Sequence, residues 1–201
     1  LLPIIRKSDD RENVMAYTES LAEQLRETYY HHRKLVVEID HRDIGGARGW
    51  DWIKKGIPVR VEIGPRDIAR DSVYVGRRDK AHNEKVSLKR DQFVGEITNI
   101  LDEIQNSLFT RAQKFSKEHT QSFDDRKAFY DFFTSKNSQN PEIHGGFAAS
   151  PWCGNEACEL KLKDELGVTI RCLPFEHENS KGSCICCDKP GKFRAVFAKA
   201  Y

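Results

Sequence analysis

The chain has 201 residues, of which 38% are hydrophobic and 32% are charged, and its formal net charge is +2. This length suffices for one large domain or two small ones, and no stretch approaches the roughly 20 apolar residues that a membrane-spanning helix needs. A balance this close to neutral does not by itself indicate a nucleic-acid partner, so any RNA contact must depend on local clusters of basic residues.

The first part of the chain alternates between helical and strand patterns. Apolar residues recur at helical spacing over about residues 10–29 and again from residue 91 to about residue 119, which predicts two amphipathic helices. Short apolar or alternating runs predict strands over residues 1–5, 35–39, 59–63 and 72–76. Strands that alternate with helices in this way predict an α/β domain whose sheet is central and whose helices lie outside.

The last part of the chain is predicted to be smaller and of mixed α+β type. The run D-D-R-K-A-F-Y-D-F-F suggests a short helix, and residues 135–141 are the most linker-like segment because Asn and Ser precede a proline there. A helix is predicted over residues 156–166, where Gly167 is a plausible C-cap. Further strands are predicted over residues 145–149, 168–172 and 193–198.

The six cysteines indicate a reducing compartment. Arg6, Lys7 and Asp9 interrupt the only apolar start, so no signal peptide is expected. Cysteines in a chain without a secretory signal favour reduced thiols and metal binding over disulfides, and the cytoplasm is therefore the expected location. Cys172 stands in the apolar run V-T-I-R-C-L-P-F and is predicted to be a buried free thiol.

Four cysteines form two close pairs that predict a metal site. Cys153 and Cys158 make the first pair, and Cys184 makes the second with either Cys186 or Cys187. Two thiolate pairs from separate turns are typical of tetrahedral zinc sites, and four thiolates leave no open position for water, so the zinc would be structural. The alternatives are reduced cysteines packed in a small core, or disulfides.

Basic residues and tryptophans gather in residues 49–80, where Trp50 and Trp52 stand among many cations. This mixture suits single-stranded RNA, because its unpaired bases can stack on aromatic rings and guanidinium planes. An arginine can also form two hydrogen bonds to the edge of a guanine. The interleaved acids support the alternative that these charges only solubilise an α/β surface. The basic residues of the segment are Lys54, Lys55, Arg60, Arg66, Arg70, Arg77, Arg78 and Lys80.

No catalytic residues are predicted in this chain. The sequence contains no Walker-type phosphate loop, no H-E-x-x-H pair and no nucleophile elbow. The run G-G-A-R-G-W is rich in glycine but lacks the strand and helix that flank a dinucleotide-binding loop.

Taken in order, the motifs resemble the C-terminal part of prolyl-tRNA synthetases of the eukaryote- and archaeon-like type. The resemblance is carried by K-G-I-P-V-R-V-E-I-G-P-R-D, W-C-G-N-E-A-C-E, C-I-C-C-D-K-P and the final F-A-K-A-Y, and it covers nearly the whole chain. It implies a class II synthetase anticodon-binding domain, a mixed sheet flanked by helices, at residues 1–118. A helical linker would follow at 119–142, and a small α+β zinc-binding domain at 143–201.

The resemblance also implies which residues meet the anticodon stem-loop of tRNA(Pro). Arg60 and Arg66 match family positions that are expected to contact anticodon guanines. Trp52, Lys55 and Arg78 complete the expected anticodon-binding set.

One position departs from the pattern of that family. The family often has a glutamate that accepts a hydrogen bond from a guanine edge, and Ile53 stands in its place here. An isoleucine cannot accept a hydrogen bond, so the neighbouring Asp51 would have to substitute, or the register of the match is shifted by one residue.

For the second domain, the resemblance assigns Cys153 and Cys158 as the first pair of zinc ligands. The second pair is Cys184 with Cys187, or with Cys186 as the alternative, because family members differ in this spacing. The carboxylate of the terminal Tyr201 matches a family feature that folds back toward the catalytic domain.

The resemblance implies the activity of a longer parent enzyme. That enzyme would be a proline--tRNA ligase, a homodimer away from membranes, whose own catalytic domain uses ATP and Mg. Because the class II catalytic motifs precede this region in the family, we expect the chain to be a piece that binds tRNA and structural zinc but is inactive alone. The alternative is a non-enzymatic RNA-binding or zinc-stabilised scaffold module built on an anticodon-binding domain.

Overall fold

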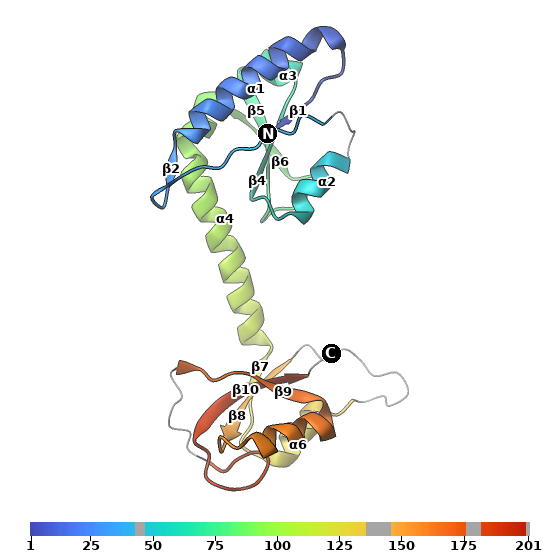
Figure 1. The fold of residues 1–201 in the computed structure, drawn as a ribbon, viewed down its shortest axis with the longest axis vertical. Coiled ribbons are helices and arrows are strands. Elements are labelled where there is room, and N and C mark those ends of the chain that lie inside the picture. Colours follow the sequence, from blue (N-terminus) through green and yellow to red (C-terminus); the bar gives the residue numbers. More distant parts are fainter. Residues whose placement is uncertain (43–46, 136–145, 176–181, 200–201) are drawn as a thin grey trace. The chain divides into compact units, whose positions relative to one another are not determined.

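The structure is a computed structural model that describes residues 1–42, 47–135, 146–175 and 182–199. It divides into two compact units, Leu1–Arg111 and Ala112–Tyr201, each with its own sheet (Figure 1). Among the helices of the described residues, none combines the length and the apolar character that crossing a bilayer requires.

A four-stranded sheet with the order β1-β4-β5-β6 forms the centre of the first unit. β1 (Leu2–Pro3) runs parallel to β4 (Val59–Ile63), whereas β5 (Ser72–Arg77) is antiparallel to both β4 and β6 (Lys85–Lys89). A mixed sheet with helices confirms the fold class predicted for this part of the chain.

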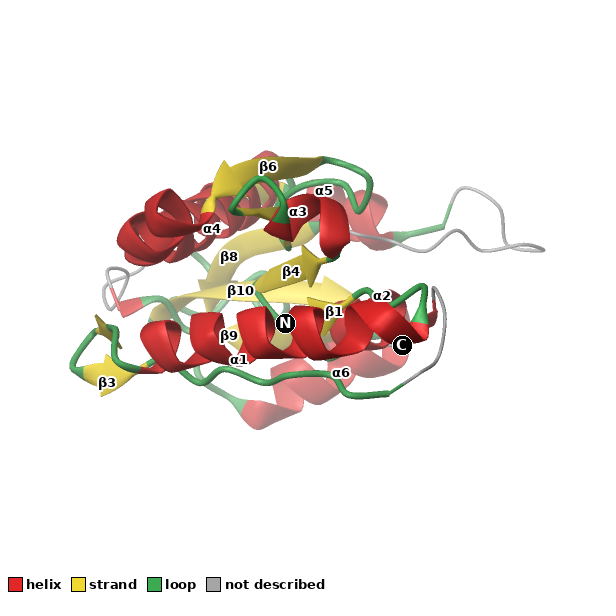
Figure 2. Ribbon diagram, turned by 90° about the horizontal axis from the view of Figure 1, so that it is seen from above, coloured by secondary structure: helices red, strands yellow, loops and turns green. Residues whose placement is uncertain are grey.

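Two long helices supply most of the helical part of the core of the first unit. α1 (Arg11–Arg26) and α4 (Arg90–Glu118) present apolar residues at helical spacing, and these pack on the side chains of β4 and β5 that point the same way. The helices are red and the strands yellow in Figure 2. The buried core residues are Leu21, Leu25, Val61, Ile63, Val73, Val75, Phe93, Ile97, Ile100 and Ile104.

Shorter elements complete the first unit. They are the single turns η1 (Ser8–Asp10) and α3 (Pro65–Ile68), the helix α2 (Ala47–Lys54), and a small hairpin of β2 (Tyr29–Tyr30) with β3 (Arg33–Lys34). α3 begins directly after β4 because Gly64 leaves the strand and Pro65 starts the turn, while the Asp67 carboxylate accepts the Gly64 N–H at 2.9 Å.

The second unit has its own mixed sheet, with the order β7-β8-β10-β9. β7 (Thr120–Ser122) is parallel to β8 (Phe147–Trp152), and β10 (Phe193–Lys199) is antiparallel to both β8 and β9 (Val168–Cys172). This second mixed sheet also agrees with the predicted fold class.

Two helices pack on the second sheet, and local signals in the sequence explain their ends. α5 (Arg126–Phe133) begins where the Asp125 carboxylate accepts the Ala128 N–H at 2.8 Å. α6 (Glu156–Leu166) ends at Gly167, whose φ of 66° is the left-handed conformation that glycine adopts most easily. This helix therefore has the bounds that the sequence predicts.

The core of the second unit includes residues of the predicted linker at 119–142. Phe129 and Phe133 of α5 are buried, and the ring of Phe129 meets those of Phe133 and Phe197 at centroid distances of 5.0 and 5.3 Å. β7 lies in the same predicted segment. The domain boundaries 1–118, 119–142 and 143–201 stay predictions.

The apolar run at residues 35–39 predicts a strand that the structure does not contain. Leu35 and Val37 pack against the core while Val36 is exposed, so burial alternates as in a strand. The backbone does not join the sheet beside it. The segment makes two backbone hydrogen bonds to Leu1, from the Leu1 ammonium to the Glu38 carbonyl at 2.6 Å and from the Asp40 N–H to the Leu1 carbonyl at 3.0 Å. These bonds do not extend into a strand, and the alternation follows the packing of Leu35 and Val37 against the core.

The sequence analysis missed one strand, and its expectation for Cys172 is wrong. The strand β6 occupies a segment with no predicted strand, where weak alternation in K-V-S-L-K is stabilised by pairing with β5. Cys172 is exposed and not buried, because it is the last residue of β9, which is an edge strand of its sheet.

Replacing Phe129 by Ala should lower the free energy of unfolding of the second unit by about 3–5 kcal/mol, because the residue is fully buried among other rings. Urea unfolding of the wild type and the variant measures this difference. Phe109→Ala is the matched control, since Phe109 is exposed on α4 and its loss should cost less than about 0.5 kcal/mol. Equal effects of the two changes would contradict the burial of α5.

Candidate functional site

The alternation of side chains along β4 separates a core face from a polar face. Val61 and Ile63 point into the core, and Arg60 and Glu62 therefore point to the opposite side of the sheet. A cavity of about 640 Å³ lies over this polar side, and it is called the β4 cavity below. Its walls come from the sheet, from the segment after β1, from the 40–42 segment and from α2.

Arg60 is a buried cation whose guanidinium has no hydrogen-bond partner among the described residues. The residue is only 7% exposed, and no described residue accepts a hydrogen bond from its guanidinium. Burial lowers the pKa of Arg60, and the nearby negative charge of Glu62 opposes that shift. A guanidinium withdrawn from water with five unused donors is prepared to bind an external group that offers acceptor atoms.

The position of Arg60 depends on a glycine in the next strand. Arg60 pairs with Gly76 of β5, and Gly76 pairs in turn with Lys85 of β6. A Cβ at Gly76 would lie 3.2 Å from Nη2 of Arg60, so the guanidinium extends across the bare backbone of this strand. The glycine makes room for the cation here because no side chain stands between β4 and β6.

Glu62 and Lys85 form an ion pair across β5. The Lys85 ammonium donates to Oε1 of Glu62 at 2.5 Å and lies 5.6 Å from the centroid of the Tyr74 ring on the strand between them. Glu62 pairs with Tyr74 in the register of the sheet, so Lys85 reaches diagonally over that ring. Both charged side chains are partly buried and line the β4 cavity.

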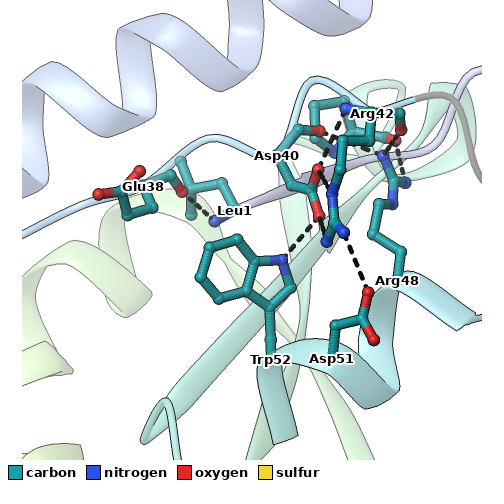
Figure 3. Close-up of polar contacts among 8 residues, drawn as sticks. Leu1, Glu38, Asp40, Arg42, Arg48, Asp51 and Trp52 are labelled. Carbon is teal, nitrogen blue, oxygen red and sulfur yellow. Dashed lines mark hydrogen bonds and ion pairs between the residues drawn. The ribbon is translucent and has the colours of Figure 1, made fainter. Parts of the chain in front are cut away.

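Asp40 holds one wall of the cavity together (Figure 3). Its two oxygens accept hydrogen bonds from Nε and Nη2 of Arg42 at 2.9 and 2.8 Å, and Oδ2 also accepts the indole N–H of Trp52 at 2.7 Å. The hydrogen bonds from Arg42, followed by that from Trp52, hold the pKa of this buried carboxyl well below its usual range. Asp40 therefore fixes α2, which carries Trp52, to the 40–42 segment.

Arg48 fastens the start of α2 to the same wall (Figure 3). Its guanidinium donates to the backbone carbonyls of Pro3 at 2.6 Å, Asp40 at 3.2 Å and Arg42 at 2.9 Å. These acceptors are neutral carbonyls, and no carboxylate of a described residue pairs with the positive charge of Arg48 at the cavity wall.

The predicted anticodon-binding residues do not all lie at one place. Arg60 lines the β4 cavity, whereas Arg66 is exposed on α3 and is not part of the cavity wall. Trp52 lies behind the wall with the Lys55 ammonium 4.3 Å from its ring centroid. Arg78 donates to the carbonyl of Gly56 at 3.3 Å, just beyond Lys55 in the chain.

Sequence reasoning missed several residues of the cavity wall. Arg42, Arg48 and His82 lie outside any recognisable motif, and Lys85 belongs to the strand that was not predicted. Trp50 is half exposed, and its ring centroid lies 4.8 Å from that of His82. The mixture of tryptophan and cations in residues 49–80 was the signal that pointed to this region.

The second candidate site is a cluster of four cysteine sulfurs. The Sγ atoms of Cys153, Cys158, Cys184 and Cys187 all lie within 4.8 Å of one another, and the Sγ of Cys153 is 3.6 Å from that of Cys158 and 3.7 Å from that of Cys187. Cys186 is buried beside them but is not a member of this group. The first pair stands between β8 and the first turn of α6, and the second stands in the turn before β10.

The protein environment shifts the pKa values of these thiols in different directions. Burial raises the pKa of Cys153 and of Cys158, which favours their neutral form in the absence of a cation. The backbone N–H of Lys189 lowers the pKa of Cys187 to about 7. A metal ion would have to displace the thiol protons, so its affinity would rise with pH.

Arg126 of α5 holds the second cysteine turn in place. Its Nε–H donates to the carbonyl of Ile185 at 3.0 Å, and its Nη2 lies 2.8 Å from an oxygen of Asp188. Asp188 has a φ of 61°, so the turn is tightly bent where it leaves the cluster. The predicted contact of Tyr201 lies outside the described residues.

Two family models match separate parts of the chain. Residues 1–100 match the family model described as "Anticodon binding domain", and residues 140–201 match "Prolyl-tRNA synthetase, C-terminal".

Individual relatives extend this likeness over the whole chain. Proline--tRNA ligase of Protochlamydia amoebophila is 41% identical over 206 residues, a match to 100% of this chain and 40% of the relative. Proline--tRNA ligase of Thermococcus kodakarensis is 34% identical, and the match covers 98% of this chain and 39% of the relative. The crystal structure of prolyl-tRNA synthetase from Cryptosporidium parvum with L-proline and AMP has a TM-score of 0.72 at 27% identity. This match covers 100% of the present chain and 40% of the Cryptosporidium chain. The chain thus spans about 40% of the length of these relatives.

Asp40→Asn should destabilise the first unit by about 2 kcal/mol at pH 7, less than for a fully buried pair because the partner Arg42 is 43% exposed. The pKa of Asp40 is lowered in the folded state, so its contribution is complete above the unfolded-state value of about 4 and is lost as the pH falls toward the folded-state value. Urea unfolding should therefore show a smaller gap between wild type and variant at pH 3.

Asp164→Asn is the control for this comparison, since that carboxylate is exposed on α6. A gap for Asp40→Asn that does not change between pH 7 and pH 3 would show that the charge of Asp40 does not stabilise the wall.

Proposed function

The chain comprises the anticodon-binding and C-terminal domains of the prolyl-tRNA synthetase family, and we propose that its β4 cavity binds the anticodon of tRNA(Pro). The observation that carries this proposal is Arg60, a buried guanidinium that no described residue engages. Every proline codon begins with two cytosines, so the matching anticodons contain guanines, and the O6 and N7 atoms of guanine are suitable acceptors for an arginine fork.

The surroundings of Arg60 support a single-stranded RNA ligand. Trp50 and His82 offer exposed rings at the cavity, on which unstacked bases can pile. Arg48 adds a positive charge that no carboxylate of the described residues pairs with, and Arg6 and Arg11 are exposed cations of the same wall. Charges of this kind attract the RNA backbone and make binding weaken as salt rises.

We further propose that the chain serves the ligation of proline to tRNA. The relatives carry the name proline--tRNA ligase, and this chain corresponds to about 40% of their length. ATP and Mg would be handled by a catalytic domain outside these residues, in a homodimeric enzyme. The free cysteines suit a reducing compartment, so we place the protein in the cytoplasm.

We also propose that Cys153, Cys158, Cys184 and Cys187 bind a structural zinc ion. The chemistry of the donors supports this, because four thiolates are a preferred ligand set for Zn²⁺. Ligands at about 2.3 Å in a tetrahedron are separated from one another by about 3.8 Å. The separations of 3.6 and 3.7 Å measured here are close to that value, and they are far longer than a disulfide bond of about 2.05 Å.

Arg60→Ala should weaken binding of the proline anticodon stem-loop by about 1–3 kcal/mol and should reduce its preference over an unrelated anticodon, because a base contact is lost. Fluorescence anisotropy with both RNAs at two salt concentrations measures these effects. The control Arg70→Ala removes an exposed arginine that does not line the cavity. Absence of any anticodon preference in the wild type would contradict the proposed function.

Replacing Cys187 by Ser should release the zinc, whereas Cys186→Ser should retain it, because only the sulfur of Cys187 lies with the other three. The two neighbouring cysteines make a matched pair of variants. Zinc content by elemental analysis and the rate of zinc transfer to a coloured chelator are the measurements. We expect transfer to be at least about tenfold faster from Cys187→Ser. The reverse order would assign Cys186 as the ligand.

A further inference from the structure

We infer that Glu62 is the hydrogen-bond acceptor that recognises the Watson–Crick edge of the base held beside Arg60, and that this base is a guanine. The inference rests on the proposed function of the β4 cavity and adds a residue that determines base specificity there. It follows from the positions of the acceptors in the cavity wall and from the arrangement of Arg60 and Glu62 on one strand.

Among the described residues of the cavity wall, the carboxylates are those of Asp40 and Glu62. Asp40 already accepts four hydrogen bonds, three from Arg42 and one from Trp52, and it is buried. Among the described residues, Glu62 accepts one hydrogen bond, from Lys85 to Oε1, and its side chain is 28% exposed. Glu62 is therefore the carboxylate with an oxygen available to a ligand.

The acceptors suggested by the sequence do not fill this role. Ile53 lines the β4 cavity and gives it an apolar surface there. Asp51 does not line the cavity, and one of its oxygens is 3.0 Å from the Arg42 guanidinium. An acceptor in the cavity thus has to come from the sheet and not from α2.

The arrangement of Arg60 and Glu62 favours guanine over the other bases. They stand two residues apart on the same face of β4, about 7 Å apart along the strand. Guanine offers acceptors at O6 and N7 and donors at N1 and the 2-amino group, so one base can use a guanidinium and a carboxylate together. In the same orientation, adenine presents the N1 acceptor to the carboxylate and an amino group where guanine has O6, so it would leave the carboxylate unsatisfied and offer the guanidinium only N7.

Lys85 engages one oxygen of the Glu62 carboxylate and leaves the other to a ligand. Its ammonium holds Oε1 of Glu62 from the far side of Tyr74, which leaves Oε2 free of described partners. Removing Lys85 should therefore leave the Glu62 carboxylate in the cavity, with both of its oxygens able to accept hydrogen bonds.

Modified bases test the inference on the 201-residue chain. Each anticodon guanine of the stem-loop is replaced separately by inosine, which lacks the 2-amino group, or by 7-deazaguanine, which lacks N7. For the wild type, we expect inosine at one of the two positions to weaken binding about tenfold. In Glu62→Ala this inosine penalty should fall below about twofold, while the 7-deazaguanine penalty, which reports on Arg60, should persist.

Lys85→Ala is the matched control, because it breaks the same ion pair and keeps the Glu62 carboxylate. This variant should retain the inosine penalty. Glu62→Met, which has a similar length and no acceptor, replaces Glu62→Ala if that protein does not fold, and its expected result is the same. Circular dichroism and urea unfolding establish that each variant is folded.

The possible results distinguish a failure of the proposed function from a failure of the role inferred for Glu62. If the wild type binds guanine, inosine and adenine loops equally, the proposed function itself fails. If the wild type prefers guanine but Glu62→Ala keeps the full inosine penalty, the proposed function stands and the role of Glu62 is overturned. An equal loss of the penalty in Lys85→Ala would assign the effect to the ion pair and would also overturn it.

Discussion

Side chains alternate strictly between the two faces of β4, and both the core and the cavity of the first unit depend on this alternation. Val61 and Ile63 are buried against the helices, and their burial fixes which way Arg60 and Glu62 point. A shift of one residue against β5 would bury both charges and expose both aliphatic side chains, at a cost of several kcal/mol. Hydrophobic packing on one face therefore positions the charges of the β4 cavity on the other.

Local patterns in the sequence predicted much of this fold. The V-R-V-E-I run has the period of a strand, and α6 carries both of its end signals, so β4 and α6 have the bounds that the sequence predicts. The run at residues 35–39 also alternates but forms no strand, and β6 forms where the pattern is weak. Strand pairing is a tertiary property, and a short segment does not reveal whether a partner lies beside it.

The candidate sites show the same limit. The sequence indicated Arg60 through its motif, but the role of Asp40 depends on Arg42 and Trp52, which meet it only in the folded chain. Cysteine spacing predicted a cluster and left two neighbours as alternatives for its fourth member. In the structure, the turn held by Arg126 brings the sulfur of Cys187, and not that of Cys186, to the other three. Spacing gives the number of ligands, and backbone conformation selects among them.

The β4 cavity is sensitive to substitution at Gly76, a residue that has no side chain. A methyl group at this position would lie 3.2 Å from Nη2 of Arg60, so the guanidinium would have to shift to make room for it. Any larger residue would compete with the arginine for space while leaving the pairing of β4 with β5 intact. A survey of harmful substitutions would therefore mark Gly76 as an RNA-contacting residue, although its effect would be steric exclusion transmitted from the neighbouring strand.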